Sequence, residues 1–129
     1  MGKRIMVVDD SRMVKLLVEE LLADTEYEVV AYCRSGEDAV EQYRKVLPDL
    51  VTMDIIMPGI DGLETAQAIL EEYPDAKIIM ASSLAYEDTL EEAKSIGAKG
   101  FLDKPLDRDR LLKMMDEVLS ADDNAEGGA

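Results

Sequence analysis

The sequence contains no histidine and a single cysteine, Cys33. The lack of histidine removes the usual general base, excludes Ser–His and Cys–His nucleophile pairs, and excludes most zinc and iron sites. One cysteine excludes an internal disulfide, and because Cys33 lies in an apolar stretch, we expect it to be a small core residue. Chemistry on this chain must therefore use carboxylates, hydroxyls and lysines, together with a cation that prefers oxygen ligands.

Long apolar segments and basic residues are also scarce. No apolar run approaches the length of a membrane span, and the N-terminus has no signal-type segment, so we expect a cytoplasmic protein without membrane association. The chain has 14 Lys and Arg against 29 Asp and Glu, which gives a net charge of −15. Such a charge repels nucleic-acid backbones and favours cations and basic protein surfaces as partners.

Apolar residues make up 47% of the 129, enough for one core, and they fall into short runs. Five runs predict buried strands: Ile5–Val8, Val29–Cys33, Leu50–Met53, Ile78–Ala81 and Gly100–Leu102. The segments between and after them carry apolar residues at helical spacing. Asp61 followed by Glu64 is typical of a capping box that opens the third helix, and Ser35 followed by Asp38 of a looser cap.

This alternation of strands and helices predicts an α/β fold, a doubly wound parallel sheet of five strands between two layers of helices. With five strands the expected order is the flavodoxin-like 2-1-3-4-5. We expect one domain over residues 1–119. Residues 120–129, with the sequence SADDNAEGGA, have no apolar periodicity and predict a flexible acidic tail or the start of a linker.

Acidic side chains follow two of the predicted strands. Asp9 and Asp10 end the first strand, and Asp54 ends the third. In the order 2-1-3-4-5 these strands are neighbours, so three carboxylates would converge in one crevice and would need a compensating positive charge. Oxygen ligands of this kind suit Mg²⁺.

A hydroxyl and an ammonium follow two other strands at the same edge. Ser82 ends the fourth strand and Lys104 follows the fifth. A carboxylate cluster with a cation, a hydroxyl and a fixed lysine matches phosphoryl transfer, in which positioning and charge neutralisation do most of the work. The acceptor would be a carboxylate, because there is no histidine and a hydroxyl would lack a base to activate it.

Each of these residues taken singly has a simpler explanation. One acid after the first strand could cap a helix, and Asp54 could be a turn residue before Pro58 and Gly59. Ser82 could be an ordinary loop hydroxyl, and Lys104 a solvated surface lysine. Only their combination at the strand ends favours a site.

Four short motifs stand at these strand ends in order: VVDD, DIIMPGIDG, ASS and KP. Together they resemble the receiver domain of two-component response regulators, over the chain up to about Leu119. Stand-alone chemotaxis regulators of the CheY type are the most similar group, because VDDS followed by Met13 resembles their opening. The resemblance implies a phosphorylation-activated signalling switch that modifies only itself and is not an enzyme in the ordinary sense.

The resemblance also implies roles for the acids and the lysine. Asp54 is similar to the aspartate that receives a phosphoryl group from a histidine kinase. Asp10 resembles the direct Mg²⁺ ligand, Asp9 a ligand that acts mainly through water, and the backbone carbonyl of Ile56 a further ligand. Lys104 would pair with the phosphoryl group.

Two more residues resemble the switch of such domains. Ser82 would hydrogen-bond to the phosphoryl group, and Phe101 is similar to the aromatic residue that then rotates inward, although Phe101 could equally be plain core. The Lys104–Pro105 peptide bond is cis in these domains. The switch would alter the surface of the fourth helix, fifth strand and fifth helix, where a downstream protein or a second copy of the chain would bind, so we expect a monomer or a phosphorylation-dependent dimer.

Three positions depart from the fast chemotaxis regulators. Ile56, two residues after Asp54, and Leu84, two residues after Ser82, are apolar where those members often place amide or acidic side chains that orient the attacking water. We therefore expect a longer phosphoryl lifetime. Phe101 stands in place of the common tyrosine, which weakens the assignment to a flagellar motor partner.

Three other functions stay open at this point. The chain could be the receiver part of a larger regulator, for example a transcriptional one. A small Mg²⁺-dependent phosphohydrolase could use a strand-end aspartate, but it would want Asp-x-Asp after the first strand and a cap over the substrate. A flavin-binding module on the same fold would need a Ser/Thr/Gly-rich phosphate loop, and the loop after the first strand is not of that composition.

Overall fold

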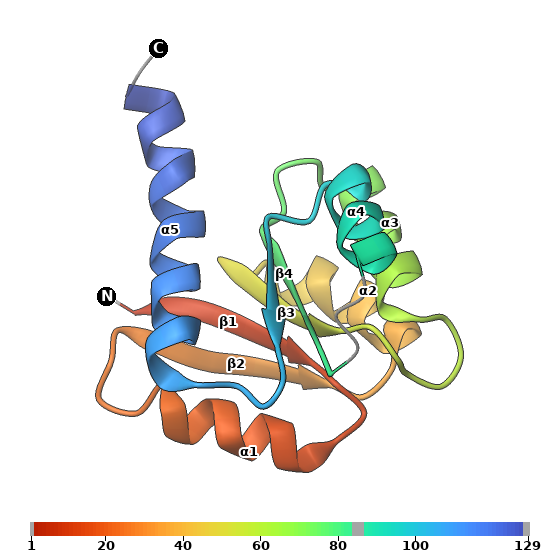
Figure 1. Ribbon diagram of the computed structural model, residues 1–129, viewed down its shortest axis with the longest axis horizontal. Coiled ribbons are helices and arrows are strands. Elements are labelled where there is room, and N and C mark those ends of the chain that lie inside the picture. The colour runs from red at the N-terminus through yellow and green to blue at the C-terminus, as the bar shows by residue number, and fades with distance from the viewer. Residues whose placement is uncertain (1, 84–86, 128–129) are drawn as a thin grey trace.

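Five strands and five helices alternate along the described part of the chain (Figure 1). The computed structural model describes residues 2–83 and 87–127. The elements are β1 (Lys3–Val8), α1 (Arg12–Leu21), β2 (Tyr27–Cys33), α2 (Gly36–Val46), β3 (Leu50–Asp54), α3 (Gly62–Glu72), β4 (Ile78–Ser82), α4 (Glu87–Ile96), β5 (Gly100–Asp103) and α5 (Arg108–Gly127). The predicted alternation of strand and helix is confirmed.

The strands form one parallel sheet in the order β2-β1-β3-β4-β5, which confirms the flavodoxin-like arrangement. β1 lies between β2 and β3, with Val8 in register with Met53. At the other side of the sheet, Ser82 is in register with Asp103. Because parallel strands all run the same way, the residues that follow β1, β3, β4 and β5 meet at one edge.

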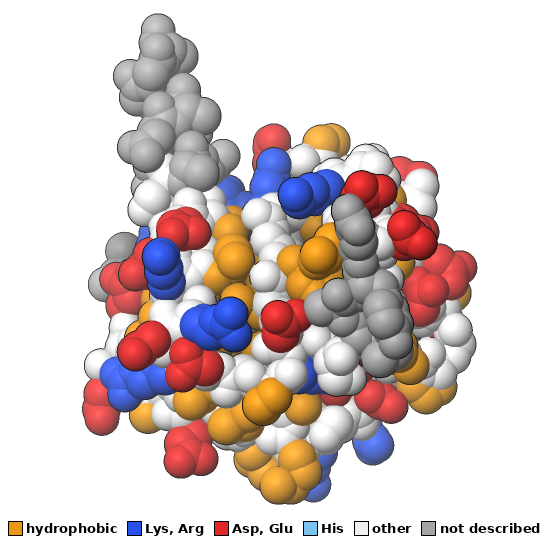
Figure 2. All heavy atoms as spheres, viewed as in Figure 1, with side chains coloured by type: hydrophobic (Ala, Val, Ile, Leu, Met, Phe, Trp, Pro, Cys, Tyr) orange, Lys and Arg blue, Asp and Glu red, His pale blue; other side chains and the backbone are white. Residues whose placement is uncertain are grey.

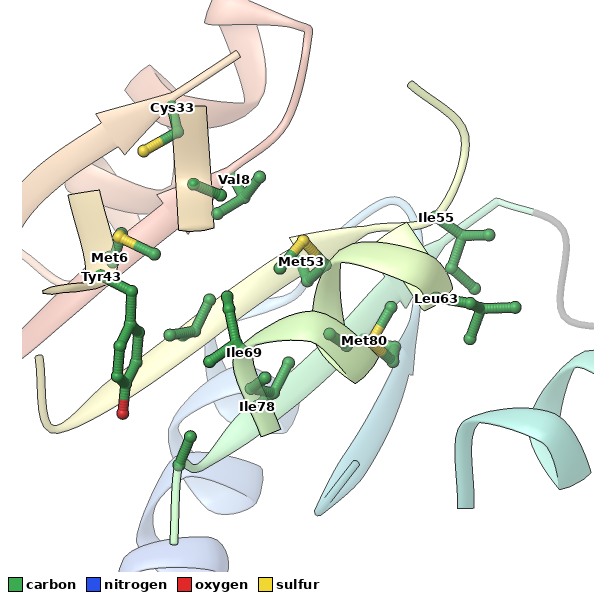
Figure 3. Packing of buried hydrophobic residues seen from close by; sticks show 14 of the residues in the cluster. Met6, Val8, Cys33, Tyr43, Met53, Ile55, Leu63, Ile69, Ile78 and Met80 are labelled. Atoms are coloured by element: carbon green, nitrogen blue, oxygen red, sulfur yellow. The ribbon is translucent and has the colours of Figure 1, made fainter. Parts of the chain in front are cut away.

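Two apolar clusters, one on each face of the sheet, hold the three layers together. Side chains of α2, α3 and α4 cover one face, where Met6, Met53 and Met80 are fully buried (Figure 3). Side chains of α1 and α5 cover the other face, where Ile5 packs with Leu111. Successive strand residues point to opposite faces, so Met6 and Ile5 serve different clusters. Burial on both faces explains why the strands read as continuous apolar runs.

Side-chain caps open α2 and α3 where the sequence predicts them. The backbone N–H of Glu64 donates to Asp61 Oδ1 at 2.8 Å, and that of Asp61 donates to Glu64 Oε1 at 3.3 Å, which completes the capping box. The backbone N–H of Asp38 donates to Ser35 Oγ at 3.2 Å. These caps fix where each loop from the carboxyl edge of the sheet turns into a helix.

The last helix is longer than the sequence pattern predicts. α5 continues past Leu119, so the backbone of the predicted tail is helical as far as Gly127. Neither proline nor glycine interrupts residues 120–126, so backbone hydrogen bonding can continue after the apolar stripe ends. This end of α5 projects beyond the rest of the domain (Figure 1). Neither α5 nor any other helix in the described residues is both long and apolar enough to cross a membrane.

Candidate functional site

Three carboxylates meet at the carboxyl edge of the sheet. One oxygen from each of Asp9, Asp10 and Asp54 lies within 4.8 Å of the other two. Asp9 and Asp10 follow β1 and Asp54 ends β3, so the adjacency of these strands brings the acids together. Asp9 and Asp54 are buried, whereas Asp10 is exposed. The predicted convergence of the three acids is therefore confirmed.

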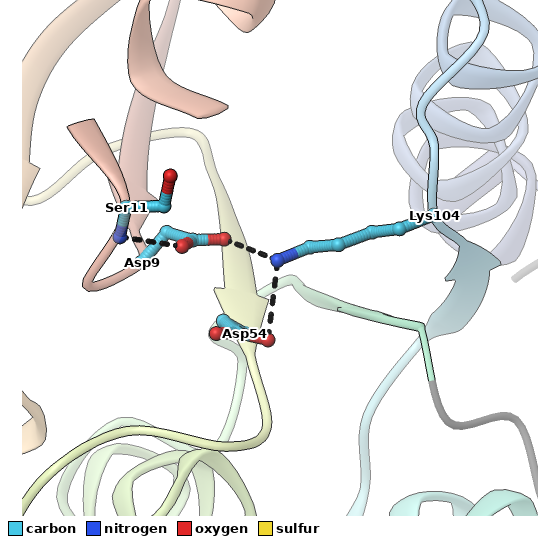
Figure 4. Close-up of polar contacts among 4 residues, drawn as sticks. All are labelled: Asp9, Ser11, Asp54 and Lys104. Carbon is cyan, nitrogen blue, oxygen red and sulfur yellow. Dashed lines mark hydrogen bonds and ion pairs between the residues drawn. The ribbon is translucent and has the colours of Figure 1, made fainter. Parts of the chain in front are cut away.

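One lysine bridges two of these acids (Figure 4). Lys104 follows β5, and its Nζ donates to Asp9 Oδ2 at 2.6 Å and lies 3.3 Å from Asp54 Oδ1. The other oxygen of Asp9 accepts from the backbone N–H of Ser11 at 2.9 Å. The two side chains pair across the edge of the sheet. This pairing is not explained if Asp9 is a simple helix cap or if Lys104 is a solvated surface lysine.

Burial and nearby charges shift the pKa values of Asp54 and Lys104. Burial raises the pKa of Asp54, and the Asp9 carboxylate raises it further, while the Lys104 ammonium only partly offsets both. Burial opposes the charge of Lys104 most strongly, but its hydrogen bond to Asp9 and the nearby Asp54 charge outweigh burial, so the pKa of Lys104 is raised. The site therefore carries excess negative charge and favours an added cation.

The predicted hydroxyl and aromatic residues lie on the next two strands. Ser82 is buried at the end of β4, and its carbonyl accepts from the backbone N–H of Lys104 at 3.0 Å. Phe101 lies half-buried on β5 and packs against the cluster under α2, α3 and α4. The Lys104–Pro105 peptide bond is cis, as the resemblance implied. All of these residues stand at or near the edge that carries the acids.

The loop between β3 and α3 returns tightly to the end of β3. The backbone N–H of Gly62 donates to Ile55 O at 2.7 Å, and a Cβ at Gly62 would lie 1.9 Å from the carbonyl oxygen of Asp54, so only glycine fits there. Ile56 lies in this loop and is 57% exposed. Leu84, the other apolar departure near the site, lies outside the described residues.

Two charged residues near the site gave no signal in the sequence. Arg34 Nη2 donates to the carbonyl of Asp10 at 3.5 Å, and the backbone N–H of Ile60 donates to Glu37 Oε1 at 3.4 Å. Both charged residues follow β2, so only the pairing of β2 with β1 places them here. Polar residues between a strand and a helix look alike in sequence, whether or not they face a site.

The three acids offer only oxygen atoms, which are the ligands that Mg²⁺ takes, and the exposed Asp10 leaves one side open to water. The domain is thus a doubly wound sheet with three carboxylates and a lysine at its carboxyl edge. The family model of the response regulator receiver domain matches residues 5–116.

Relatives and solved structures agree with that match. The chemotaxis protein CheY of Thermotoga maritima is 36% identical over 118 residues, which cover 92% of this chain and 98% of the relative. The transcriptional regulatory protein DegU of Brevibacillus brevis is 35% identical over 127 residues, which cover 98% of this chain and 51% of the relative. A chain of the CheX–CheY–BeF3–Mg+2 complex from Borrelia burgdorferi superposes with a TM-score of 0.87 at 31% identity, covering 90% of this chain and 88% of that one.

The chain therefore belongs to the response regulator receiver domain family. It is a signalling domain of a two-component system, and its family acts as a phosphoryl acceptor rather than as an enzyme of the usual kind. Receiver domains bind Mg²⁺ in an acidic pocket, and Asp9, Asp10 and Asp54 form such a pocket here.

Proposed function

We propose that Asp54 accepts a phosphoryl group from a histidine kinase. The observation that carries this proposal is the position of its carboxylate, with one oxygen within 4.8 Å of oxygens of Asp9 and Asp10 and another contact of 3.3 Å to Lys104 Nζ. An acceptor carboxylate needs positive groups around it to offset the charge of the incoming phosphoryl group. Asp9 also stands beside the cation pocket and the ammonium, but its two oxygens already accept from Lys104 Nζ and from the backbone N–H of Ser11, so we assign the acceptor to Asp54.

The acids would divide the binding of Mg²⁺ among them. Asp10 would bind the ion directly, with Asp54 and the carbonyl of Ile56, while Asp9 would act mainly through water. Two contacts support that division, because Asp9 is already bonded to Lys104 and to the N–H of Ser11, whereas Asp10 is exposed. When bound, the ion neutralises charge on the acceptor and on the phosphoryl oxygens.

Ser82 and Phe101 would transmit the added charge to the surface. Ser82 would hydrogen-bond to the phosphoryl group from its buried place at the end of β4. Phe101 lies on the adjacent strand and lines a cavity of about 80 Å³ between β5 and α4, into which its ring could turn. A phosphoryl group that favours one of the two positions of the Phe101 ring would change the surface to which partners bind.

The surface of α4, β5 and α5 would then bind the downstream partner. Three hollows lie along it, and each pair of them has a lining residue in common, namely Lys99, Phe101 or Met114. Figure 2 shows hydrophobic, basic and acidic side chains together on this face. The lining combines apolar residues with the basic residues Lys94, Lys99, Arg110 and Lys113 and the acids Asp103 and Glu117, and such a mixed surface on a chain of net charge −15 favours protein docking. The occupant would be a separate protein or a phosphorylated second copy, and the domain is otherwise a monomer.

The same site would support self-phosphorylation from small donors such as acetyl phosphate, because it supplies its own cation pocket and lysine. The phosphohistidine would come from outside this domain, since residues 1–129 contain no histidine. We place its action in the cytoplasm, without membrane or nucleic-acid binding by this domain.

Two outputs are supported by different relatives. The CheY relative of matching length supports a stand-alone switch in chemotaxis. The DegU relative, of which the chain spans about half, supports a receiver that controls a further domain of a larger regulator. Deleting the gene and comparing swimming behaviour with transcript levels would separate the two.

Intact mass after incubation with acetyl phosphate tests the acceptor. We expect one phosphoryl adduct that requires Mg²⁺ and disappears in Asp54→Asn. An Asp61→Asn variant serves as the control, because Asp61 is an acid at the start of α3 that caps the helix and should leave the adduct unchanged. An adduct that persists in Asp54→Asn would overturn the assignment, and no adduct at all would leave a docking domain without phosphorylation.

A further inference from the structure

A second cation stands at the rim of the acidic site. Arg34 is exposed in the loop after β2, and its Nη2 lies 3.5 Å from the carbonyl oxygen of Asp10. The residue before it is tied to the same site, because the backbone N–H of Asp9 donates to Cys33 O at 3.0 Å. The hydrogen bond between the ends of β1 and β2 therefore fixes the position from which the Arg34 side chain extends.

The charges of the site explain why a cation at the rim matters. Ionised Asp9, Asp10 and Asp54 with protonated Lys104 carry a net charge of −2, which a bound Mg²⁺ would bring to zero. A phosphoryl donor is an anion, and it approaches a neutral pocket on a chain of net charge −15. Local positive charge at the mouth of a pocket raises the local concentration of an anion against such a field.

We propose that Arg34 draws the anionic phosphoryl donor to the pocket and at the same time weakens the binding of Mg²⁺. This proposal rests on Asp54 being the phosphoryl acceptor. A guanidinium presents a planar fork that pairs with phosphate oxygens. The same charge repels a divalent cation held by Asp10, whose carbonyl it contacts. Arg34 therefore acts on the two ligands of the site in opposite directions.

Substituting Arg34→Ala separates this role from a structural one. One unit charge within several ångströms of a doubly charged ion in water is worth about a five-fold change in binding. We expect the KM for acetyl phosphate to rise about five-fold with little change in the maximal rate, and the Kd for Mg²⁺ to fall by a similar factor, by the same reasoning. Arg34→Glu should enlarge both effects, Arg34→Lys should retain most of the wild-type behaviour, and high salt should shrink the differences.

A matched control is available on the same side of the sheet. Arg44 lies in the last turn of α2, where its Nε pairs with Glu72 Oε2 at 2.7 Å, away from the carboxyl edge. Arg44→Ala removes the same charge and should leave both constants unchanged. Equal effects of Arg34→Ala and Arg44→Ala would reduce the role to net charge and overturn the proposal.

Two measurements separate a failure of the proposal about Arg34 from a failure of the assignment of Asp54 as acceptor. The KM comes from the rate of adduct formation by intact mass, and the Kd for Mg²⁺ from isothermal titration calorimetry on the unphosphorylated chain. Weaker Mg²⁺ binding in Arg34→Ala would indicate a structural defect and contradict the proposal. If the wild-type chain forms no adduct, the acceptor assignment and the role of Arg34 toward the donor both fail, while calorimetry still decides its effect on the cation.

Discussion

The ammonium of Lys104 donates to Oδ2 of Asp9 at 2.6 Å, and the two side chains are 18% and 3% exposed. This pair connects opposite parts of the sheet, because Asp9 follows β1 and Lys104 follows the edge strand β5. The end of β3 lies between them, with the Asp54 carboxylate 3.3 Å from the same ammonium. A single cation thus holds together two buried acids that would otherwise repel each other.

Replacing Lys104 by methionine should destabilise the metal-free domain. Asp9 and Asp54 would stay buried without a positive partner, and we expect the free energy of unfolding to fall by about 2 kcal/mol. Added Mg²⁺ should recover much of this loss, so urea unfolding with and without Mg²⁺ is the measurement. Lys45→Met removes only an exposed pair with Glu41 and should change the free energy by less than about 0.5 kcal/mol. A loss in Lys104→Met that Mg²⁺ does not relieve would contradict this account.

The substitution Asp54→Asn should stabilise the metal-free domain at neutral pH. The pKa of Asp54 in the fold is raised above its ordinary value of 3.8, mainly by burial and then by Asp9. Its contribution therefore favours folding while it is protonated and is lost as the pH rises from 3.8 through the folded value. Asparagine does not ionise, so thermal unfolding from acid to neutral pH should show a gain that vanishes at the acid end. A gain of equal size at every pH would point to packing instead.

Leu47→Gly should stabilise the domain. Leu47 is the C-cap of α2 with φ 46°, in the left-handed region, and the residue is 54% exposed, so little packing is lost. Glycine adopts this conformation without strain, and we expect a gain of about 1 kcal/mol in urea unfolding. The converse change, Gly97→Ala after α4, where φ is 104°, should lose about 1 kcal/mol. A loss in both variants would show that the Leu47 side chain contributes packing.

Cys33 should resist thiol reagents in the folded chain. It is fully buried, and burial, followed by the Asp38 charge, raises the pKa of its thiol to about 12. Both the reactive thiolate and access to it are therefore suppressed at neutral pH. We expect no reaction with Ellman's reagent over the period in which the urea-unfolded chain reacts completely. Rapid labelling without urea would indicate frequent opening of the β2–α2 region.

The exposed side chain of Ile56 should prolong the aspartyl phosphate. An apolar group two residues after Asp54, the proposed acceptor, offers no hydrogen bond to the attacking water, so we expect Ile56→Asn to shorten the phosphoryl lifetime several-fold. The decay of the adduct in intact mass, after removal of acetyl phosphate, measures this. A wild-type half-life of only seconds with Mg²⁺ would contradict the expectation of a long lifetime. Met13→Asn is the control, since Met13 is also exposed but lies on α1.

Much of the architecture was predictable because the local pattern of apolar and capping residues agrees with the elements that the folded chain forms. Strands buried on both faces leave continuous apolar runs, and the Asp61–Glu64 box marks the start of α3. The backbone of residues 120–127 escaped prediction, because helix without an apolar stripe has no periodic signal. The meeting of the acids and Lys104 at one edge of the sheet was predictable, since each of them stands at or just after the end of a strand. Arg34 and Glu37 were not, since nothing in a polar loop marks the direction of a side chain.

The sequence by itself determined the order of strands and helices, because the pattern of apolar residues is a property of the chain. It also determined that any chemistry would use oxygen ligands and an ammonium, because the types of residue are a property of the chain too. Only the tertiary structure decided that Lys104 reaches Asp9 and Asp54, and that Arg34 stands beside Asp10. Those pairs are separated along the chain and depend on strand order, register and side-chain direction. The physical reason is that electrostatic interaction depends on distances in space, which local sequence patterns do not contain.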